Sequence, residues 1–222
     1  MLRTFVGAAL LTAGLCGSAL GADAIASPDP YDWSGFYLGV QGNYDFGSAA
    51  HSFSNGAPSD NSNPRGIAGG IHAGYNFPVN KIILGLEADA EIAAVNGSFN
   101  NLTGFTSSGA SHLYSDESLR LRLGLPMDRL LPYVTGGVAF GQVRFEGGPS
   151  GGPCCGYNSS PIGYTVGAGV DYAISDNVSA RIEYRYTDFG TSMGGLAPTF
   201  SGVSMPTHLQ TNAITVGLSF KF

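Results

Sequence analysis

The last eleven residues of the chain alternate between large apolar side chains and small or polar ones. The apolar positions, two residues apart, are Ile214, Val216, Leu218, Phe220 and Phe222. A period of two is typical of a β-strand with one apolar and one polar face. The pattern predicts a strand over 212–222 whose apolar face meets lipid, with Phe222 at the membrane interface.

The same alternation recurs in seven earlier segments, so eight strands are predicted. They cover 35–46, 66–77, 82–95, 113–125, 132–146, 163–174, 178–189 and 212–222. The fifth is the least regular: Val143 and Phe145 form one face and Gln142 and Arg144 the other, but the phase before them is unclear. A bulge near 136–137 is one explanation.

Short and long connections alternate between these segments. The short ones are 78–81, 126–131 and 175–177. The long ones, rich in Gly, Ser, Asn and Pro, are 47–65, 96–112, 147–162 and 190–209. Outer-membrane barrels combine short periplasmic turns with long external loops and an even strand number. We therefore expect an all-β fold: an eight-stranded antiparallel up-and-down transmembrane β-barrel with both termini in the periplasm of a Gram-negative bacterium.

Outward-facing aromatic residues fall at two heights if the strands alternate in direction. The periplasmic group is Phe36, Tyr75, Phe77, Tyr172, Phe220 and Phe222. The outer group is Tyr44, Phe46, Phe145, Tyr164, Tyr184 and Tyr186. Two aromatic girdles around an aliphatic band are typical of a membrane barrel, whereas a soluble lipocalin-like barrel would carry its apolar residues inside.

The polar face of the predicted strands carries a set of charged residues. They are Glu87, Asp89, Glu91, Arg120, Arg122, Asp171, Arg181, Glu183 and Arg185. Counting along the strands sets Glu87 level with Arg120, and Asp171 across from Arg181. Eight strands leave little interior room, and an unpaired buried charge costs several kcal/mol. We favour a salt-bridged plug over the charged lining of a conduction path. No nucleophile converges with the carboxylates, so we predict no catalytic residue and no enzyme.

The N-terminus has the pattern of a secretory signal. Arg3 precedes an apolar stretch over 5–15, and small residues follow. We expect a signal peptide over 1–21, with cleavage after Gly21 or Ala24, a short periplasmic segment over 22–32, and the barrel over 33–222. Cys16 follows Leu15 rather than Gly or Ala, which disfavours a lipoprotein.

Composition narrows the class of protein further. Charged residues make up only 12% of the 222 residues, and there are 34 glycines, which disfavours both a helical bundle and disorder. The formal net charge of -6 argues against nucleic acid as a partner, because no basic patch is present to contact phosphates. After the N-terminal stretch, no apolar run of about 18 residues predicts a transmembrane helix.

Histidines and cysteines in the predicted loops offer weaker signals. His51, His112 and His208 lie in or beside external loops, where their imidazoles could bind a metal or haem iron. No pair of them has the spacing of metal ligands within one element. We therefore favour solvated side chains and predict no cofactor and no metal. Cys154 and Cys155 are adjacent in a Gly- and Pro-rich loop. A vicinal disulfide that staples the loop, two free thiols and links between chains all fit this pair.

Four stretches resemble a known family. They are the Trp-Ser-Gly-Phe-Tyr-Leu-Gly run at 33–39, the Pro-Tyr-Val-Thr-Gly-Gly run at 132–137, the Gly-Val-Asp-Tyr run at 169–172 and the segment 179–190. Together with the terminal Phe222 they resemble the small OmpA-like outer-membrane barrel surface proteins of alphaproteobacteria, which include major surface antigens. Because the sequence ends with the last predicted strand, we expect none of the peptidoglycan-binding domain that two-domain members carry after the barrel.

This resemblance implies an outer-membrane location and a role in envelope integrity, antigenicity or host contact. It also implies contact with outer-membrane lipid and lipopolysaccharide, with an assembly machinery that reads Phe222, and with molecules on a host surface. Some members are porin-like or haem-binding, but no matching motif carries over. A narrow channel for small solutes, a haem-binding surface protein and a lipid-modifying enzyme remain the alternatives.

Overall fold

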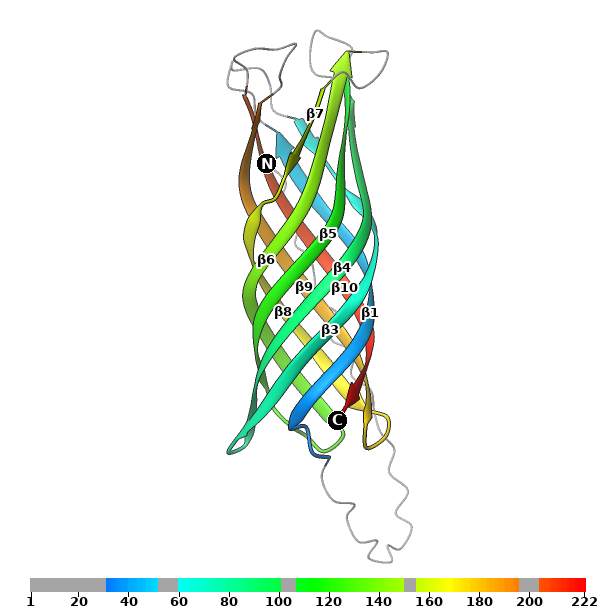
Figure 1. Ribbon diagram of the computed structural model, residues 1–222, viewed down its shortest axis with the longest axis vertical. Helices are drawn as coiled ribbons and strands as arrows, with labels where there is room; N and C mark the ends of the chain where they lie inside the picture. The colour runs from blue at the N-terminus through cyan, green and yellow to red at the C-terminus, as the bar shows by residue number, and fades with distance from the viewer. Residues whose placement is uncertain (1–30, 52–59, 101–106, 150–154, 196–203) are drawn as a thin grey trace, which may run out of the picture.

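Eight long antiparallel strands follow one another around a closed barrel (Figure 1). The computed structural model describes residues 31–51, 60–100, 107–149, 155–195 and 204–222. The barrel strands are β1 (Gly35–His51), β3 (Arg65–Val79), β4 (Ile82–Asn100), β5 (Ser107–Gly124), β6 (Leu130–Pro149), β8 (Ile162–Ala173), β9 (Val178–Gly195) and β10 (Ser204–Lys221). The predicted eight-stranded antiparallel barrel is confirmed. Within the described ranges, no helix is long and apolar enough to cross a membrane.

The barrel closes where the last strand meets the first. β10 pairs with β1 from Lys221 opposite Tyr37 up to Thr207 opposite His51. The Phe222 amide donates to the Phe36 carbonyl over 3.0 Å, and the two rings lie 5.6 Å apart. Closure leaves the eight-stranded cylinder without the free edge that would invite pairing with other chains.

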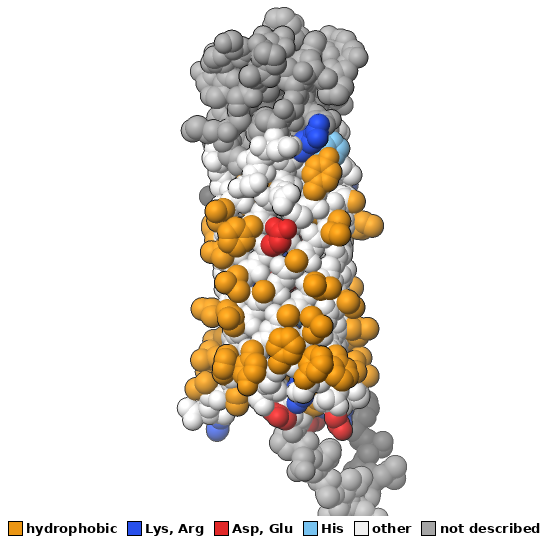
Figure 2. Space-filling model, in the orientation of Figure 1, with side chains coloured by type: hydrophobic (Ala, Val, Ile, Leu, Met, Phe, Trp, Pro, Cys, Tyr) orange, Lys and Arg blue, Asp and Glu red, His pale blue; other side chains and the backbone are white. Residues whose placement is uncertain are grey.

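The outward face of the barrel is apolar and the inward face is polar. Leu121 is 69% exposed, whereas its neighbours Arg120 and Arg122 are at most 2% exposed. Figure 2 shows apolar side chains covering the lower and middle part of the barrel, and far fewer above them. The predicted girdle aromatics whose side chains are described face outward, with Tyr186 half-buried. This arrangement fits a wall that faces lipid.

Most strands run further outward than the sequence predicts. β1 continues to His51, β6 to Pro149, and β10 begins at Ser204. Two short strands, β2 (Asp60–Ser62) and β7 (Cys155–Ser159), pair with the outer parts of β1 and β6. Much of each predicted long loop is therefore part of the sheet. The predicted strands end where the alternation of lipid-facing apolar residues ends, but the backbone pairing between neighbouring strands continues beyond that point.

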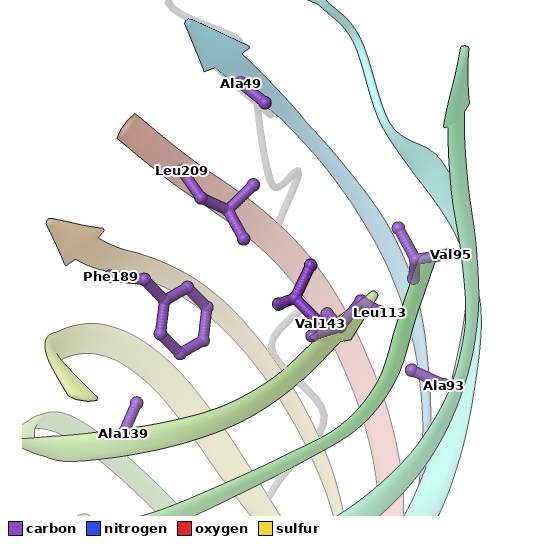
Figure 3. Packing of buried hydrophobic residues seen from close by; sticks show 8 residues of the cluster. All are labelled: Ala49, Ala93, Val95, Leu113, Ala139, Val143, Phe189 and Leu209. Atoms are coloured by element: carbon purple, nitrogen blue, oxygen red, sulfur yellow. The ribbon is translucent and has the colours of Figure 1, made fainter. Parts of the chain in front are cut away.

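Towards the outer ends of the strands the two faces exchange polarity. Val143 is 3% exposed, while Gln142 and Arg144 face outward, so the predicted outward position of Val143 is wrong. The inward residues there form an apolar cluster (Figure 3): Ala49, Ala93, Val95, Leu113, Ala139, Val143, Phe189 and Leu209. Outside the bilayer the exterior meets water, so the apolar side chains are buried in the lumen instead.

A bulge on β5 helps to make this exchange. The register of β6 against β5 and β8 is continuous through Gly136 and Gly137, so the predicted bulge there is wrong. The irregularity lies on β5 between Leu113 and Ser115, and opposite it on β4 between Ile92 and Val95. One extra residue reverses which side chains face inward. Tyr114 is left exposed and Leu113 turns into the lumen.

Candidate functional site: the interior charge network

The nine charged residues singled out from the sequence all lie inside the barrel. None is more than 6% exposed, and they come from four strands: β4 (Glu87, Asp89, Glu91), β5 (Arg120, Arg122), β8 (Asp171) and β9 (Arg181, Glu183, Arg185). The period of two places them on the inward face. Glu87 pairs in register with Arg120, and Asp171 with Arg181.

Glu87 is the centre of this network. It accepts hydrogen bonds from Arg120 Nη2 and Tyr37 Oη, each over 2.6 Å, and from Arg181 Nη2 over 2.7 Å. Arg122 Nη1 lies 3.8 Å from its Oε2 atom. The order of strands around the barrel separates β9 from β4 by four steps in either direction, through β8, β6 and β5 or through β10, β1 and β3. The Glu87–Arg181 pair therefore joins opposite walls.

A second set of contacts lies one step further outward. Arg120 Nη1 is 2.5 Å from Glu183 Oε1, and its Nη2 is 3.0 Å from Asp89 Oδ2. Arg185 Nη1 is 3.1 Å from Asp89 Oδ1, and its Nε is 3.2 Å from the same Glu183 oxygen. Each guanidinium thus bridges two carboxylates from different strands, which satisfies charges that would otherwise be costly to bury.

The network is extended at both ends. Towards the periplasm, Asp171 is 2.5 Å from Arg122 Nη2 and 3.4 Å from Arg181 Nε. Towards the outside, Glu91 is 3.5 Å from Arg185 Nη1 and accepts hydrogen bonds from the side-chain amides of Gln41 and Asn43. Strands β1, β4, β5, β8 and β9 are therefore tied together through the lumen.

Tyrosines complete the network, and the sequence prediction leaves them out. The Tyr133 hydroxyl donates to Glu183 Oε2 over 2.8 Å, and the Arg122 guanidinium lies 3.7 Å from the centre of the Tyr133 ring. This ring fits because Gly169 faces it: a Cβ at residue 169 would lie 2.7 Å from the ring. An inward tyrosine beside inward glycines is the sequence signal that would have identified these contacts.

The periplasmic end of the lumen is filled by the segment that precedes β1. Trp33 is 5% exposed and packs with Ile83, Leu131 and Ala173. Its Nε1 donates to the Asp128 carbonyl over 3.0 Å. These contacts place an indole across the mouth of the barrel below the charge network.

Lys221 joins the end of β10 to the same N-terminal segment. Its ammonium donates to the Asp32 carbonyl and lies 4.9 Å from the centre of the Tyr31 ring. Hydrogen bonds from Ser34 lower the pKa of the Asp32 carboxyl, so that the group stays charged 3.8 Å from Lys221 Nζ. The segment before β1 is thereby held against the floor of the barrel.

The loop histidines do not converge in the described residues. His208 Nε2 is 2.9 Å from Asp188 Oδ1, and His112 Nδ1 is 2.5 Å from Asn96 Oδ1. The side chain of His51 lies outside the described part. Within the described ranges, no group of three His, Cys, Asp or Glu residues is placed to hold a metal ion.

Neither predicted cysteine position is tested by the structure. Cys154 lies outside the described residues, and Cys155 begins β7 with its side chain undescribed. The loop disulfide stays a prediction. The signal peptide is likewise a prediction, because residues 1–30 are outside the described ranges.

A closed barrel with an apolar outer wall, two aromatic girdles and a charged interior defines an outer-membrane β-barrel protein. The chain belongs to the family described as outer membrane protein beta-barrel domain, whose pattern matches residues 8–222. The predicted location in the outer membrane of a Gram-negative bacterium is confirmed, as is the resemblance to alphaproteobacterial surface proteins.

Similar proteins come from related bacteria. The 31 kDa outer-membrane immunogenic protein of Brucella melitensis is 30% identical over 229 residues, which cover 92% of this chain and 94% of the relative. The 22 kDa outer membrane protein of Rhizobium leguminosarum bv. viciae is 32% identical over 194 residues, which cover 86% of this chain and 78% of the relative. The 25 kDa outer-membrane immunogenic protein of Brucella canis is 29% identical over the full length of both chains.

Solved structures share the fold at low identity. The outer membrane protein OprG from Pseudomonas aeruginosa gives a TM-score of 0.53 at 14% identity, covering 85% of this chain and 97% of that one. The outer membrane protease OmpT from Escherichia coli gives 0.52 at 9% identity, covering 88% and 98%. At these identities the likeness is one of fold alone.

Proposed function

We propose that this chain is a structural outer-membrane surface protein, closed to solutes, that carries its external loops above the bilayer. The observation that supports this most directly is the Glu87–Arg181 pair, which joins opposite walls of the lumen over 2.7 Å. Ion pairs from β4, β5, β8 and β9, and hydrogen bonds from β1, surround it inside the lumen. A network in which every arginine contacts at least two carboxylates suits a plug better than an ion path.

Two further barriers lie in series with the network. The apolar cluster that includes Val95, Leu113 and Phe189 fills the outer part of the lumen. Trp33 and Leu131 fill the periplasmic part. An ion crossing the barrel would have to leave water at both apolar levels, which is unfavourable.

The extended strands suggest how the barrel presents its loops. Because β6 continues to Pro149 and carries β7, the sheet rises beyond the apolar belt before the connections begin (Figure 1). Such a support would hold surface segments away from the lipid, where antibodies or host molecules could reach them. The names of two Brucella relatives, both called immunogenic, support antigenic loops in this chain.

Solute uptake into vesicles tests this proposal. Liposomes containing the refolded protein are placed in an isotonic sugar solution, and swelling is followed by light scattering. We expect swelling no faster than in protein-free liposomes for arabinose or smaller solutes. Rapid swelling with the wild type that changes in an Arg120→Gln variant would overturn the closed barrel in favour of a narrow channel.

A further inference from the structure

On the outward face, β3 and β10 change from apolar to polar within a single two-residue step, while β1 between them keeps an aromatic residue, Phe46. One row of cross-strand partners is Ile67, Tyr44 and Ile214, all at least 46% exposed. The next row outward is Arg65, Phe46 and Asn212. Adjacent same-face rows are separated by about 7 Å along a strand. This step therefore marks the boundary between acyl chains and headgroups on this side of the barrel.

A surface hollow of about 400 Å³ lies at this boundary. Tyr44 and Phe46 form its apolar wall, and Ser48, Asn63 and Arg65 supply polar groups. Each of these side chains faces outward. The hollow thus offers apolar surface on its membrane side and hydrogen-bond donors on its water side.

Arg65 differs from the lumen arginines in its charge environment. Each of the four lumen arginines contacts at least two carboxylates. Within the described residues Arg65 forms no ion pair. A guanidinium beside an apolar wall at the membrane surface is suited to an anion that arrives with an apolar tail, because its donors match two phosphate oxygens at once.

We infer that this hollow binds the phosphorylated headgroup of an outer-leaflet lipid. The phosphate contacts Arg65, with Asn63 and Ser48 as further donors, and an acyl chain lies along Phe46, Tyr44 and Ile67. Charge complementarity selects a phosphate, and the apolar wall selects a lipid over a free anion. The site depends on the outer wall alone, so it stands whether or not the lumen conducts.

Titration with a defined lipid tests the site. The refolded full-length protein in zwitterionic detergent micelles is titrated with lipid A that carries its phosphates, and bound lipid is counted by native mass spectrometry. The variants are Arg65→Gln and, as a matched control, Arg144→Gln, which removes an outward arginine from β6 away from the hollow. Dephosphorylated lipid A and inorganic phosphate serve as the other probes.

We expect the wild type and Arg144→Gln to bind lipid A equally, and Arg65→Gln to bind at least tenfold more weakly. Dephosphorylated lipid A should bind the wild type as weakly as phosphorylated lipid A binds Arg65→Gln, and millimolar phosphate should not displace the lipid. Equal weakening by both arginine variants would overturn the site, because it would indicate general surface charge. Unchanged binding by Arg65→Gln, or full displacement by inorganic phosphate, would also overturn it.

Discussion

Arg181 on β9 and Glu87 on β4 form an ion pair of 2.7 Å between strands on opposite sides of the barrel. Both side chains are at most 1% exposed. Tyr37 and Arg120 contact the same carboxylate, so Glu87 joins its own strand β4 to β1, β5 and β9. Contacts of this kind give the lumen the role that a packed core has in other proteins. Removing this ion pair should therefore lower the free energy of unfolding.

Replacing Glu87 by Gln should destabilise the barrel strongly. The change leaves the guanidinium groups of Arg120 and Arg181 without their shared carboxylate, and breaking a buried pair costs about 3–5 kcal/mol. Urea unfolding in phospholipid vesicles, followed by tryptophan fluorescence, measures the free energy of unfolding. The control is Arg129→Gln, whose partner Asp176 lies 4.0 Å away on the surface, and which should cost at most about 1 kcal/mol. Equal midpoints for the two variants would contradict the central role of Glu87.

Adding a methyl group at Gly169 should disturb the tyrosine that packs on Arg122. A Cβ there would lie 2.7 Å from the Tyr133 ring and 2.6 Å from the Ile182 carbonyl oxygen, and overpacking of this kind costs about 1–3 kcal/mol. Gly136→Ala is the matched control, because its Cβ would meet no atom closer than 3.9 Å. Unfolding midpoints should fall for Gly169→Ala and change little for Gly136→Ala. The same shift in both would show that the general effect of replacing a strand glycine, rather than the close contacts at residue 169, decides the outcome.

The exchange of polarity above the membrane predicts opposite responses at two adjacent residues of β6. Val143→Asp places a charge in the apolar cluster, which is expensive without a partner, whereas Gln142→Asp changes an exposed side chain. Unboiled samples on mild SDS gels report the folded fraction. We expect less folded protein only for Val143→Asp. If Gln142→Asp lost the folded form and Val143→Asp kept it, the result would indicate that Val143 faces outward, as the sequence pattern predicts.

Deletion of Phe222 should reduce assembly rather than any activity. The residue donates its amide to Phe36 at the seam and is 70% exposed at the periplasmic rim. We propose that this exposed ring is the signal read by the assembly machinery. Immunoblots of outer-membrane fractions should show a lower yield for the deletion and a near-normal yield for Phe222→Tyr, which keeps an aromatic end. A normal yield of the truncated chain would count against this role.

The sequence predicts the barrel well because lipid imposes a simple pattern. Wherever the wall faces acyl chains, as from Leu119 to Leu123, every second residue must be apolar, and period two alone identifies the strand. The same logic puts Glu87 and Arg120 on one face and at one level. The alternation of short and long connections then predicts the direction of each strand and places both termini at the periplasmic end of the barrel.

The outer part of the barrel does not follow this pattern, for a physical reason. Once the exterior meets water, Val143 and Leu209 turn inward, and residues such as Gln142 take the outer face. A local pattern cannot show which solvent the wall meets. The bulge beside Tyr114 adds one residue to β5 and reverses the alternation of inward and outward side chains. In the sequence the pattern of the strand therefore ends at a point where the strand itself continues. The contact of Tyr133 with Glu183 joins strands distant in sequence, so the only local sign of it is an inward tyrosine beside inward glycines.

Single-protein recording in planar lipid bilayers tests the closed barrel most directly. The refolded wild type is inserted, and current is followed at high salt over a range of voltages. The network around Glu87 and Arg181, with apolar levels on both sides, predicts insertion without a steady conductance. A reproducible open-state current from the wild type that is abolished or altered in Glu87→Gln or Arg120→Gln would contradict the account and establish a channel.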